Sequence, residues 1–225
     1  MNRFACTMVR SGLLALLLLF PTTGGAVHDT LEVGRFSVGS LEGWEARSFK
    51  GETDYRIVTN DGRRVLQAES RGSASGRYRR LKVDPREYPL LRWSWKVAGT
   101  VSGENARSKG GDDFAARVYV IFPGFFFWQS RSIAYVWSGS LKKGEAIPNA
   151  YTGRVMVVAV ESGDLLAGKW VSEERNYLAD YRRLFGEEPG SLGAVAVMTD
   201  SDNTGGQALA WYGDIGLVAG KEVGQ

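Results

Sequence analysis

The feature that most constrains this chain is a series of short runs that are apolar or alternate between apolar and polar residues. Gly, Pro, Asn and Asp separate the runs at intervals of roughly ten to twenty residues, which is typical of a β-sandwich. We predict an all-β, antiparallel β-sandwich with strands over Tyr55–Thr59, Val65–Ser70, Gly76–Val83, Leu90–Val97, Phe114–Phe122, Ser132–Ser138, Arg154–Glu161, Gly193–Asp200 and Ala208–Val218. Arg154–Glu161 and Gly193–Met198 are apolar on both faces, so both faces should be covered.

One short amphipathic helix interrupts the strand pattern. Its predicted bounds are Glu173–Phe185, with Ser172 as N-cap and with Gly186 and Pro189 at its end. Tyr, Leu and Phe recur on one face of this segment. Such spacing is typical of a helix that covers a sheet face or edge.

Residues 1–26 are predicted to be a signal peptide. Arg3 and Arg10 give a basic start, Leu13–Phe20 is apolar, and small residues run from Thr22 to Ala26. The apolar run is too short for a membrane-spanning helix, which needs about 20 residues. We therefore expect an exported bacterial protein, periplasmic or extracellular, with residues 27–225 forming a single β-sandwich domain and no transmembrane segment after cleavage.

Cleavage would leave a nearly neutral chain without cysteine. It removes Arg3, Arg10 and Cys6, which leaves 26 basic and 25 acidic side chains in 199 residues. The single histidine, His28, lies two residues past the predicted cut. These counts exclude disulfides, cysteine zinc sites and histidine-based centres. No cofactor is required, and near-zero charge with export argues against a nucleic-acid partner.

An acidic loop runs from Asp200 to Gly206 with the sequence DSDNTGG. Alternating oxygen-bearing side chains followed by glycine suit a hard cation such as Ca²⁺. Asp200 and Asp202 are candidate metal ligands, and Asp214 in the closing strand is a third. The alternative is a hairpin loop with Asx turns, and the sequence leaves both interpretations open.

Two adjacent carboxylates, Asp112 and Asp113, precede an apolar strand. Neighbouring side chains in a strand point to opposite sides, so this pair should not act together as general acid and base. We expect both carboxylates to be solvated at the start of the strand, and we assign no catalytic residue. If the protein is an enzyme, it would cleave polysaccharide by hydrolysis or elimination, assisted by Tyr151 or Arg117, and its candidate carboxylates are Asp112, Asp113, Asp200 and Asp202.

Strand alternation groups polar and aromatic side chains. An arginine within an apolar strand, such as Arg117, is costly unless it pairs or faces a wet cleft. Aromatic rings beside such donors stack on and hydrogen-bond to sugars. We therefore predict a ligand-binding face formed by Arg117, Tyr119, Tyr135 and Trp137. The alternative for the aromatic residues is burial in the core.

Four aromatic residues follow Pro123-Gly124 between two predicted strands: Phe125, Phe126, Phe127 and Trp128. At an exposed hairpin tip they would form a contact surface for a ligand, a membrane or a protein partner. A strand that continues into the core explains them equally well.

Several strings resemble an uncharacterised bacterial family, domain of unknown function 3047. They are FSVGSLEGWEARSF from Phe36, GDDFAARVYVIF from Gly111, NAYTGRVMVVAVESG from Asn149, KWVSEERNYLADYRRLFGEEP from Lys169 and VAVMTDSDNTGGQALAWYGDI from Val195. The resemblance implies a galactose-binding-like jelly roll, similar to carbohydrate-binding modules. It carries no established activity.

Three functions are consistent with the sequence. The first is a non-catalytic module that binds a glycan-like or small envelope ligand. The second is the carboxylate-based polysaccharide hydrolase or lyase. The third is a structural or assembly partner in the cell envelope, which would dock through the aromatic tip at Phe125–Trp128.

Overall fold

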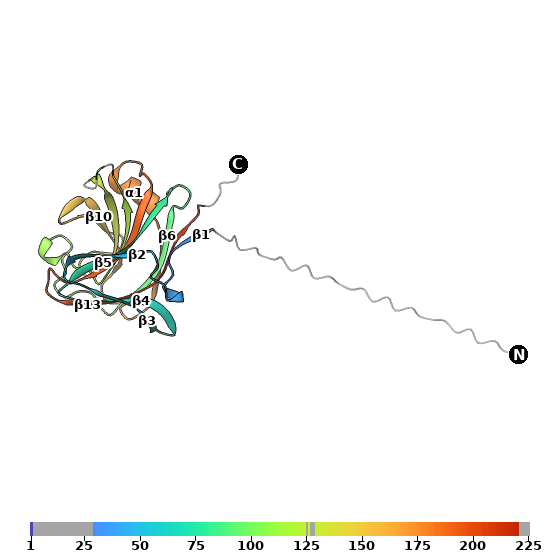
Figure 1. Cartoon of the computed structure of the whole chain (residues 1–225), viewed down its shortest axis with the longest axis horizontal. Coiled ribbons are helices and arrows are strands. Elements are labelled where there is room, and N and C mark those ends of the chain that lie inside the picture. Colours follow the sequence, from blue (N-terminus) through green and yellow to red (C-terminus); the bar gives the residue numbers. More distant parts are fainter. Residues whose placement is uncertain (2–28, 125, 127–128, 221–225) are drawn as a thin grey trace.

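The alternating runs form two β-sheets that pack face to face, with one short helix at the end of the sandwich (Figure 1). This computed structural model describes Met1 and residues 29–124, 126 and 129–220. The predicted signal peptide lies outside the described residues, apart from Met1. No helix among the described residues is long and apolar enough to cross a membrane.

The first sheet, sheet A, has six strands: β1 (Thr30–Gly34), β3 (Asp54–Asn60), β4 (Arg63–Arg71), β6 (Leu90–Val97), β11 (Val171–Asn176) and β13 (Gln207–Val218). Their order is β11-β6-β13-β4-β3, and β1 also pairs with β13. All of these pairs are antiparallel.

The second sheet, sheet B, has seven strands: β2 (Trp44–Lys50), β5 (Ala74–Val83), β7 (Ala116–Phe122), β8 (Arg131–Ser138), β9 (Ala146–Asn149), β10 (Thr152–Ser162) and β12 (Leu192–Asp200). Their order is β2-β5-β12-β7-β8-β10-β9. The pair β8·β10 is parallel, and the others are antiparallel. The predicted all-β sandwich is confirmed, except that one strand pair is parallel in the otherwise antiparallel sheets.

Each of the nine predicted strands corresponds to a strand of the structure, with ends that differ by up to two residues. Four further strands were not predicted: β1, β2, β9 and β11. Strand β2 is largely exposed, and β9 is short and contains Pro148, so neither has the apolar alternation that identifies a strand.

The predicted start of the helix at Glu173 is wrong. Helix α1 spans Tyr177–Phe185, and its N-cap is Asn176, whose side chain accepts a hydrogen bond from the backbone N–H of Ala179 at 2.9 Å. The residues before it belong to β11, because Val171–Asn176 pairs with all of β6 except its last two residues. Sheet pairing therefore outweighs the local helical pattern at Glu173.

The interior between the sheets is rich in aromatic residues. Trp93 stacks on Tyr135 with ring centroids 5.5 Å apart, and Trp95 packs on Trp137 at 5.9 Å. These pairs join β6 of sheet A to β8 of sheet B. All four side chains are buried, so they hold the two sheets together.

A second apolar cluster covers part of the outer face of sheet B, over β8 and β10. It contains Ala106, Phe114, Ala134, Val136, Leu141, Ile147, Val157 and Ala159. The cluster draws on the segment before β7, which includes the 3-10 turn η2 (Lys109–Gly111), and on residues between β8 and β10. It confirms that both faces of β10 are covered. The outer face over β2, β5, β12 and β7 is not part of this cluster.

The aromatic tip lies between β7 and β8, which pair as an antiparallel hairpin. Phe126 is 46% exposed. Phe125, Phe127 and Trp128 lie outside the described residues.

Candidate functional site

A groove of about 890 Å³ runs over the outer face of sheet B, across β2, β5, β12 and β7. We call it the sheet-B groove. Its floor follows from strand alternation in β12, where Ala194, Ala196 and Met198 line the groove while Val195 and Thr199 are buried. Three β12 residues that line the groove, Gly193, Ala194 and Ala196, are small, so the sheet leaves room for a ligand beside Met198.

Two tyrosines flank this floor. Ala196 is in register with Tyr78 on β5 and with Tyr119 on β7. The Tyr78 hydroxyl donates to the carboxylate of Glu45 at 2.6 Å, and Arg80 donates to the same carboxylate at 2.9 Å. These bonds fix the orientation of the Tyr78 ring at the groove.

Further groove residues come from elements that lie outside the central strands. Phe49 and Arg47 come from the edge strand β2, Asn149 is the last residue of β9, and Tyr151 lies in the turn between β9 and β10. The Tyr151 hydroxyl donates to Asn203 Oδ1 at 2.6 Å. Phe49 was not predicted as a site residue, because β2 lacks the apolar alternation that identifies a strand. Alternation within Gly76–Arg80 was the signal that could have identified Tyr78.

Arg117 closes one end of the groove through a buried ion pair. Its Nε donates to Asp200 Oδ1 at 2.9 Å, and its Nη2 donates to Asp200 Oδ2 and to the carbonyl oxygen of Asp112. The guanidinium also lies over the Phe114 ring, 4.4 Å from its centroid. Arg117 is thus paired and lines the groove, as the cost of burying an isolated arginine requires.

Burial is the largest single influence on the pKa of each partner in this ion pair. It raises the pKa of Asp200 to about 7, in opposition to the attraction of Arg117. Burial alone would lower the pKa of Arg117, but the charge of Asp200, with Tyr119 and Asp112, raises it well above its usual value.

Asp112 and Asp113 point in different directions, but both are buried, so the expectation of solvated acids is wrong. Asp112 accepts from the Asn149 amide at 2.8 Å at the groove. Asp113 accepts from the backbone N–H of Thr204 at 2.7 Å and of Asn203 at 3.2 Å. Burial alone would raise the pKa of Asp113. The hydrogen bonds from the loop together lower it by more, so the pKa lies below its usual value.

Carboxylate oxygens of Asp113, Asp200 and Asp202 lie within 4.8 Å of one another, close enough to hold a metal ion. Protein donors already occupy much of this cluster, because Arg117 binds Asp200 and the loop backbone binds Asp113. Lys50 Nζ lies 3.9 Å from Asp202. Arg117 and Lys50 thus supply positive charge where a cation would otherwise be needed.

Asp214 does not belong to this acidic cluster. It lies in β13, and its carboxylate accepts from the Ser37 backbone N–H at 2.8 Å and from the Ser37 hydroxyl at 2.5 Å. The loop from Asp200 is also no hairpin, because β12 belongs to sheet B and β13 to sheet A. Asp214 therefore lies apart from Asp200 and Asp202, and Asp113 is the third carboxylate near them; a separate metal-binding role of Asp214 stays a prediction.

The structure separates the four predicted ligand-binding residues. Arg117 and Tyr119 line the sheet-B groove. Tyr135 and Trp137 are fully buried between the sheets, where the Tyr135 hydroxyl donates to Asp180 at 2.9 Å and Trp137 Nε1 donates to the Gly163 carbonyl at 2.9 Å. A single face formed by all four residues does not exist, because alternation in β8 directs Tyr135 and Trp137 inward.

The candidate catalytic residues gather around one end of the groove. Asp112, Asp200, Asp202 and Tyr151 line it, together with Arg117, whereas Asp113 holds the neighbouring loop. The carboxylates of Asp112 and Asp200 are engaged with Asn149 and Arg117.

The fold and the groove define a β-sandwich with a hollowed outer sheet face. The chain belongs to the family described as "Protein of unknown function (DUF3047)", whose match covers residues 42–216. A comparison with curated proteins found no match.

Solved structures of similar fold include a family 11 carbohydrate-binding module of a cellulosomal cellulase from Clostridium thermocellum. It is 10% identical, with a TM-score of 0.46, over 84% of this chain and 95% of that chain. The cleaved adhesin domain K1 of Lys-gingipain from Porphyromonas gingivalis is 13% identical, with a TM-score of 0.40, over 85% of this chain and 99% of that chain. The mannan-recognising module TmCBM27 is 13% identical, with a TM-score of 0.41, over 87% and 100%.

Proposed function

We propose that this chain is a non-catalytic binding domain whose sheet-B groove holds a glycan-like ligand. The observation that carries the proposal is the small-residue floor at Ala196, flanked in register by Tyr78 and Tyr119. A sugar ring has one apolar face that packs on aromatic rings, and its hydroxyl groups need polar partners at the edges.

The groove has both properties. Its volume of about 890 Å³ is within the range of small-molecule sites, about 300–1,000 Å³. Polar edges are supplied by Arg47, Ser132, Asn149 and Asn203. The charges of Arg117 and Arg80 are balanced within the protein by Asp200 and Glu45. Arg47 and Arg77 also line the groove and can donate hydrogen bonds to ligand hydroxyl groups.

The engaged carboxylates support binding rather than catalysis. A general acid and a general base need carboxyl groups free to exchange protons with the substrate. Asp200 is held by Arg117, Asp113 by the loop that it supports, and Asp112 by Asn149. Asp202 accepts from the Asn203 amide at 3.0 Å and lies 3.9 Å from Lys50 Nζ.

Calorimetric titration with a panel of neutral oligosaccharides tests the proposal. We expect saturable heat with at least one of them and about tenfold weaker binding by Tyr119→Ala, through loss of the ring contact. Tyr88→Ala, which removes a tyrosine that does not line the groove and donates its hydroxyl to Asp29 at 2.8 Å, is the matched control and should leave affinity unchanged. Absence of heat across the panel would contradict the proposal. Release of reducing ends that disappears in Asp200→Asn would support the hydrolase instead.

Calcium binding at Asp113, Asp200 and Asp202 is a second candidate function, favoured by the proximity of their oxygens. A bound ion would compete with Arg117 and Lys50 for these carboxylates. A rise in melting temperature with Ca²⁺ over EDTA that is lost in Asp202→Asn would support this function. If Ca²⁺ changes the melting temperature of neither protein, Arg117 and Lys50 balance these carboxylates without a bound ion.

We also propose that residues 1–26 direct export from a bacterial cell. Their basic start and short apolar run support this location. Fractionation of cells that express the full chain should recover a shortened protein outside the cytoplasm. Full-length protein confined to the cytoplasm would contradict it.

A further inference from the structure

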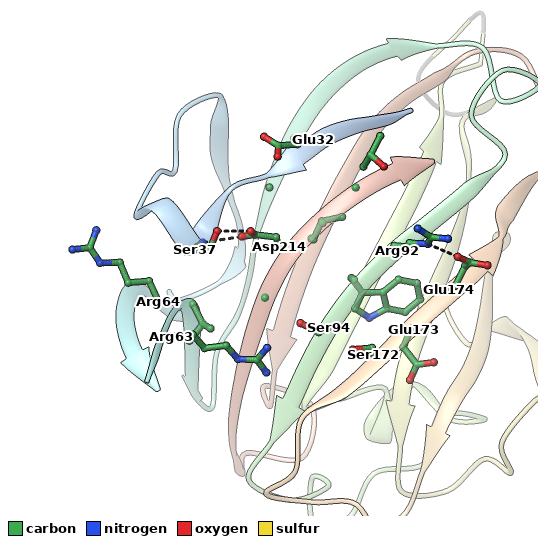
Figure 2. A pocket seen from close by; sticks show the side chains of 17 residues that line it. Glu32, Ser37, Arg63, Arg64, Arg92, Ser94, Ser172, Glu173, Glu174 and Asp214 are labelled. Carbon is green, nitrogen blue, oxygen red and sulfur yellow. Dashed lines mark hydrogen bonds and ion pairs between the residues drawn. The ribbon is translucent and has the colours of Figure 1, made fainter. Parts of the chain in front are cut away.

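A second groove, of about 580 Å³, lies on the outer face of sheet A (Figure 2). We call it the sheet-A groove. It forms because two strands share one side of β13: β4 pairs with it from Gln207 to Tyr212, and β1 pairs with it from Ile215 to Val218. Gly213 and Asp214 fall between these two pairings, so neither β4 nor β1 pairs with them on that side of β13.

The floor of the sheet-A groove is made of small residues. An added Cβ at Gly213 would lie only 2.2 Å from Ser94 Oγ, so the close contact of β13 with β6 requires glycine here. Ser94 is in register with Ser172 on β11. Within the part of the chain that the structure describes, neither serine hydroxyl takes part in a hydrogen bond, so both are available to a ligand.

The carboxylates around the groove already have partners. Their partners are Arg35 for Glu32 at 2.9 Å, Trp95 Nε1 for Glu173 at 3.3 Å, Arg92 for Glu174, and the Ser37 N–H and hydroxyl for Asp214. Figure 2 shows the last two of these contacts on opposite sides of the groove. Their negative charges are thus partly compensated inside the protein.

Two arginines that line the groove, Arg64 and Arg63, form no ion pair among the described residues, and Arg63 is the one whose guanidinium faces the groove. No carboxylate of the described residues forms an ion pair with it, since nearby Asp61 is held by Lys96 at 2.8 Å and by Trp170 Nε1 at 3.0 Å. Its guanidinium carbon lies 3.6 Å from the centroid of the Trp170 ring. In Figure 2 the guanidinium of Arg63 points into the groove, whereas that of Arg64 points away from it.

Stacking on an indole orients a guanidinium through its flat face. Its in-plane N–H groups then stay available for two parallel hydrogen bonds, the geometry that matches a carboxylate. A dianion such as phosphate would be repelled by Glu174 and Asp214 nearby, whereas these same oxygens can accept hydrogen bonds from hydroxyl groups. The preferred ligand therefore has one negative charge and several hydroxyls.

We propose that the sheet-A groove binds a uronic acid residue, with Arg63 on the sugar carboxylate and Ser94 and Ser172 on the sugar hydroxyls. This site goes beyond the proposed function of the sheet-B groove and does not depend on it. It would give the domain two ligand sites on opposite faces of one sandwich.

The test is a titration of the full protein with galacturonate, followed by NMR at the Trp170 indole N–H, which lies beside Arg63. Galactose and inorganic phosphate at matched ionic strength are the comparison probes. We expect a saturable shift with galacturonate, about tenfold weaker binding in Arg63→Gln, and a much smaller loss in Arg64→Gln, which removes the same charge from a side chain that points away from the groove. Ser94→Ala should weaken binding several-fold. It is the second test variant, to be used if Arg63→Gln lowers the melting temperature.

The proposal is overturned by any of three results. They are the absence of a saturable shift up to about 50 mM galacturonate, equal or tighter binding of galactose or phosphate, and equal losses in Arg63→Gln and Arg64→Gln. Tyr119→Ala separates the two sites, because it should leave this titration unchanged even if no ligand binds the sheet-B groove.

Discussion

Arg117 on β7 and Asp200 at the end of β12 form an ion pair that is almost completely withdrawn from solvent, with the residues 3% and 1% exposed. The pair joins neighbouring strands at one end of the sheet-B groove. Its Nε–Oδ1 distance of 2.9 Å and the second Nη2–Oδ2 contact give it fork geometry. It links the loop from Asp200 to the groove floor.

Removing one partner of this pair should be costly. Arg117→Leu leaves a buried carboxylate unpaired, so we expect unfolding free energy to fall by about 3 kcal/mol at pH 8. The loss should be smaller at pH 5, where Asp200 can take up a proton. Urea unfolding measures both, with the exposed Arg64→Leu as control. Equal effects of the two variants would contradict a structural role for the pair.

Glu173 predicts a pH dependence of stability. Burial raises its pKa to about 7, and the like charge of Glu161 adds to this. A raised carboxyl pKa means that the folded state binds the proton more tightly, so this contribution to stability is lost as pH rises from about 4.5 to about 7. Glu173→Gln should therefore gain stability relative to the parent between pH 5 and pH 8, by about 1 kcal/mol because solvent screens this half-buried side chain.

Thermal or urea unfolding at the two pH values checks this expectation. Glu174→Gln is the matched control, because its carboxylate lies in an exposed ion pair with Arg92 on the other face of β11. The same gain in both variants, or none in Glu173→Gln, would count against it.

The helix boundary gives a third prediction. Asn176→Ala removes the side chain that caps α1 and should lower unfolding free energy by about 1 kcal/mol. Ser172→Ala, at the cap position that the sequence suggested, should have little effect because Ser172 lies within β11. Urea unfolding distinguishes them, and a larger loss in Ser172→Ala would contradict the observed boundary.

Local patterns predicted the strands well where one face is buried and the other is polar. Leu90–Val97 matches β6 at both ends, because its tryptophans alternate with polar residues. Patterns failed where pairing with a distant strand decides the structure, as in β11, whose acidic residues resemble the first turn of a helix. They also missed β2, which has no buried face of its own.

The candidate site was predicted only in part for a similar reason. Alternation within β7 correctly placed Arg117 and Tyr119 on one face, yet it could not assign the inner and outer faces of β8. Tyr135 and Trp137 were therefore grouped with them, although they point into the sandwich. The proximity of Asp113 to Asp200 depends on the pairing of β7 with β12, two strands far apart in the sequence, which has no signature in local spacing.

The most direct test of the sheet-B groove fills its floor. Ala196→Leu places a larger side chain between Tyr78 and Tyr119, whereas Ala46→Leu adds the same atoms on β2 outside the groove. Calorimetry with an oligosaccharide that binds the parent protein should show at least about tenfold weaker binding in Ala196→Leu and unchanged binding in Ala46→Leu. Unchanged affinity in a folded Ala196→Leu variant would contradict the assignment of this groove as the ligand site.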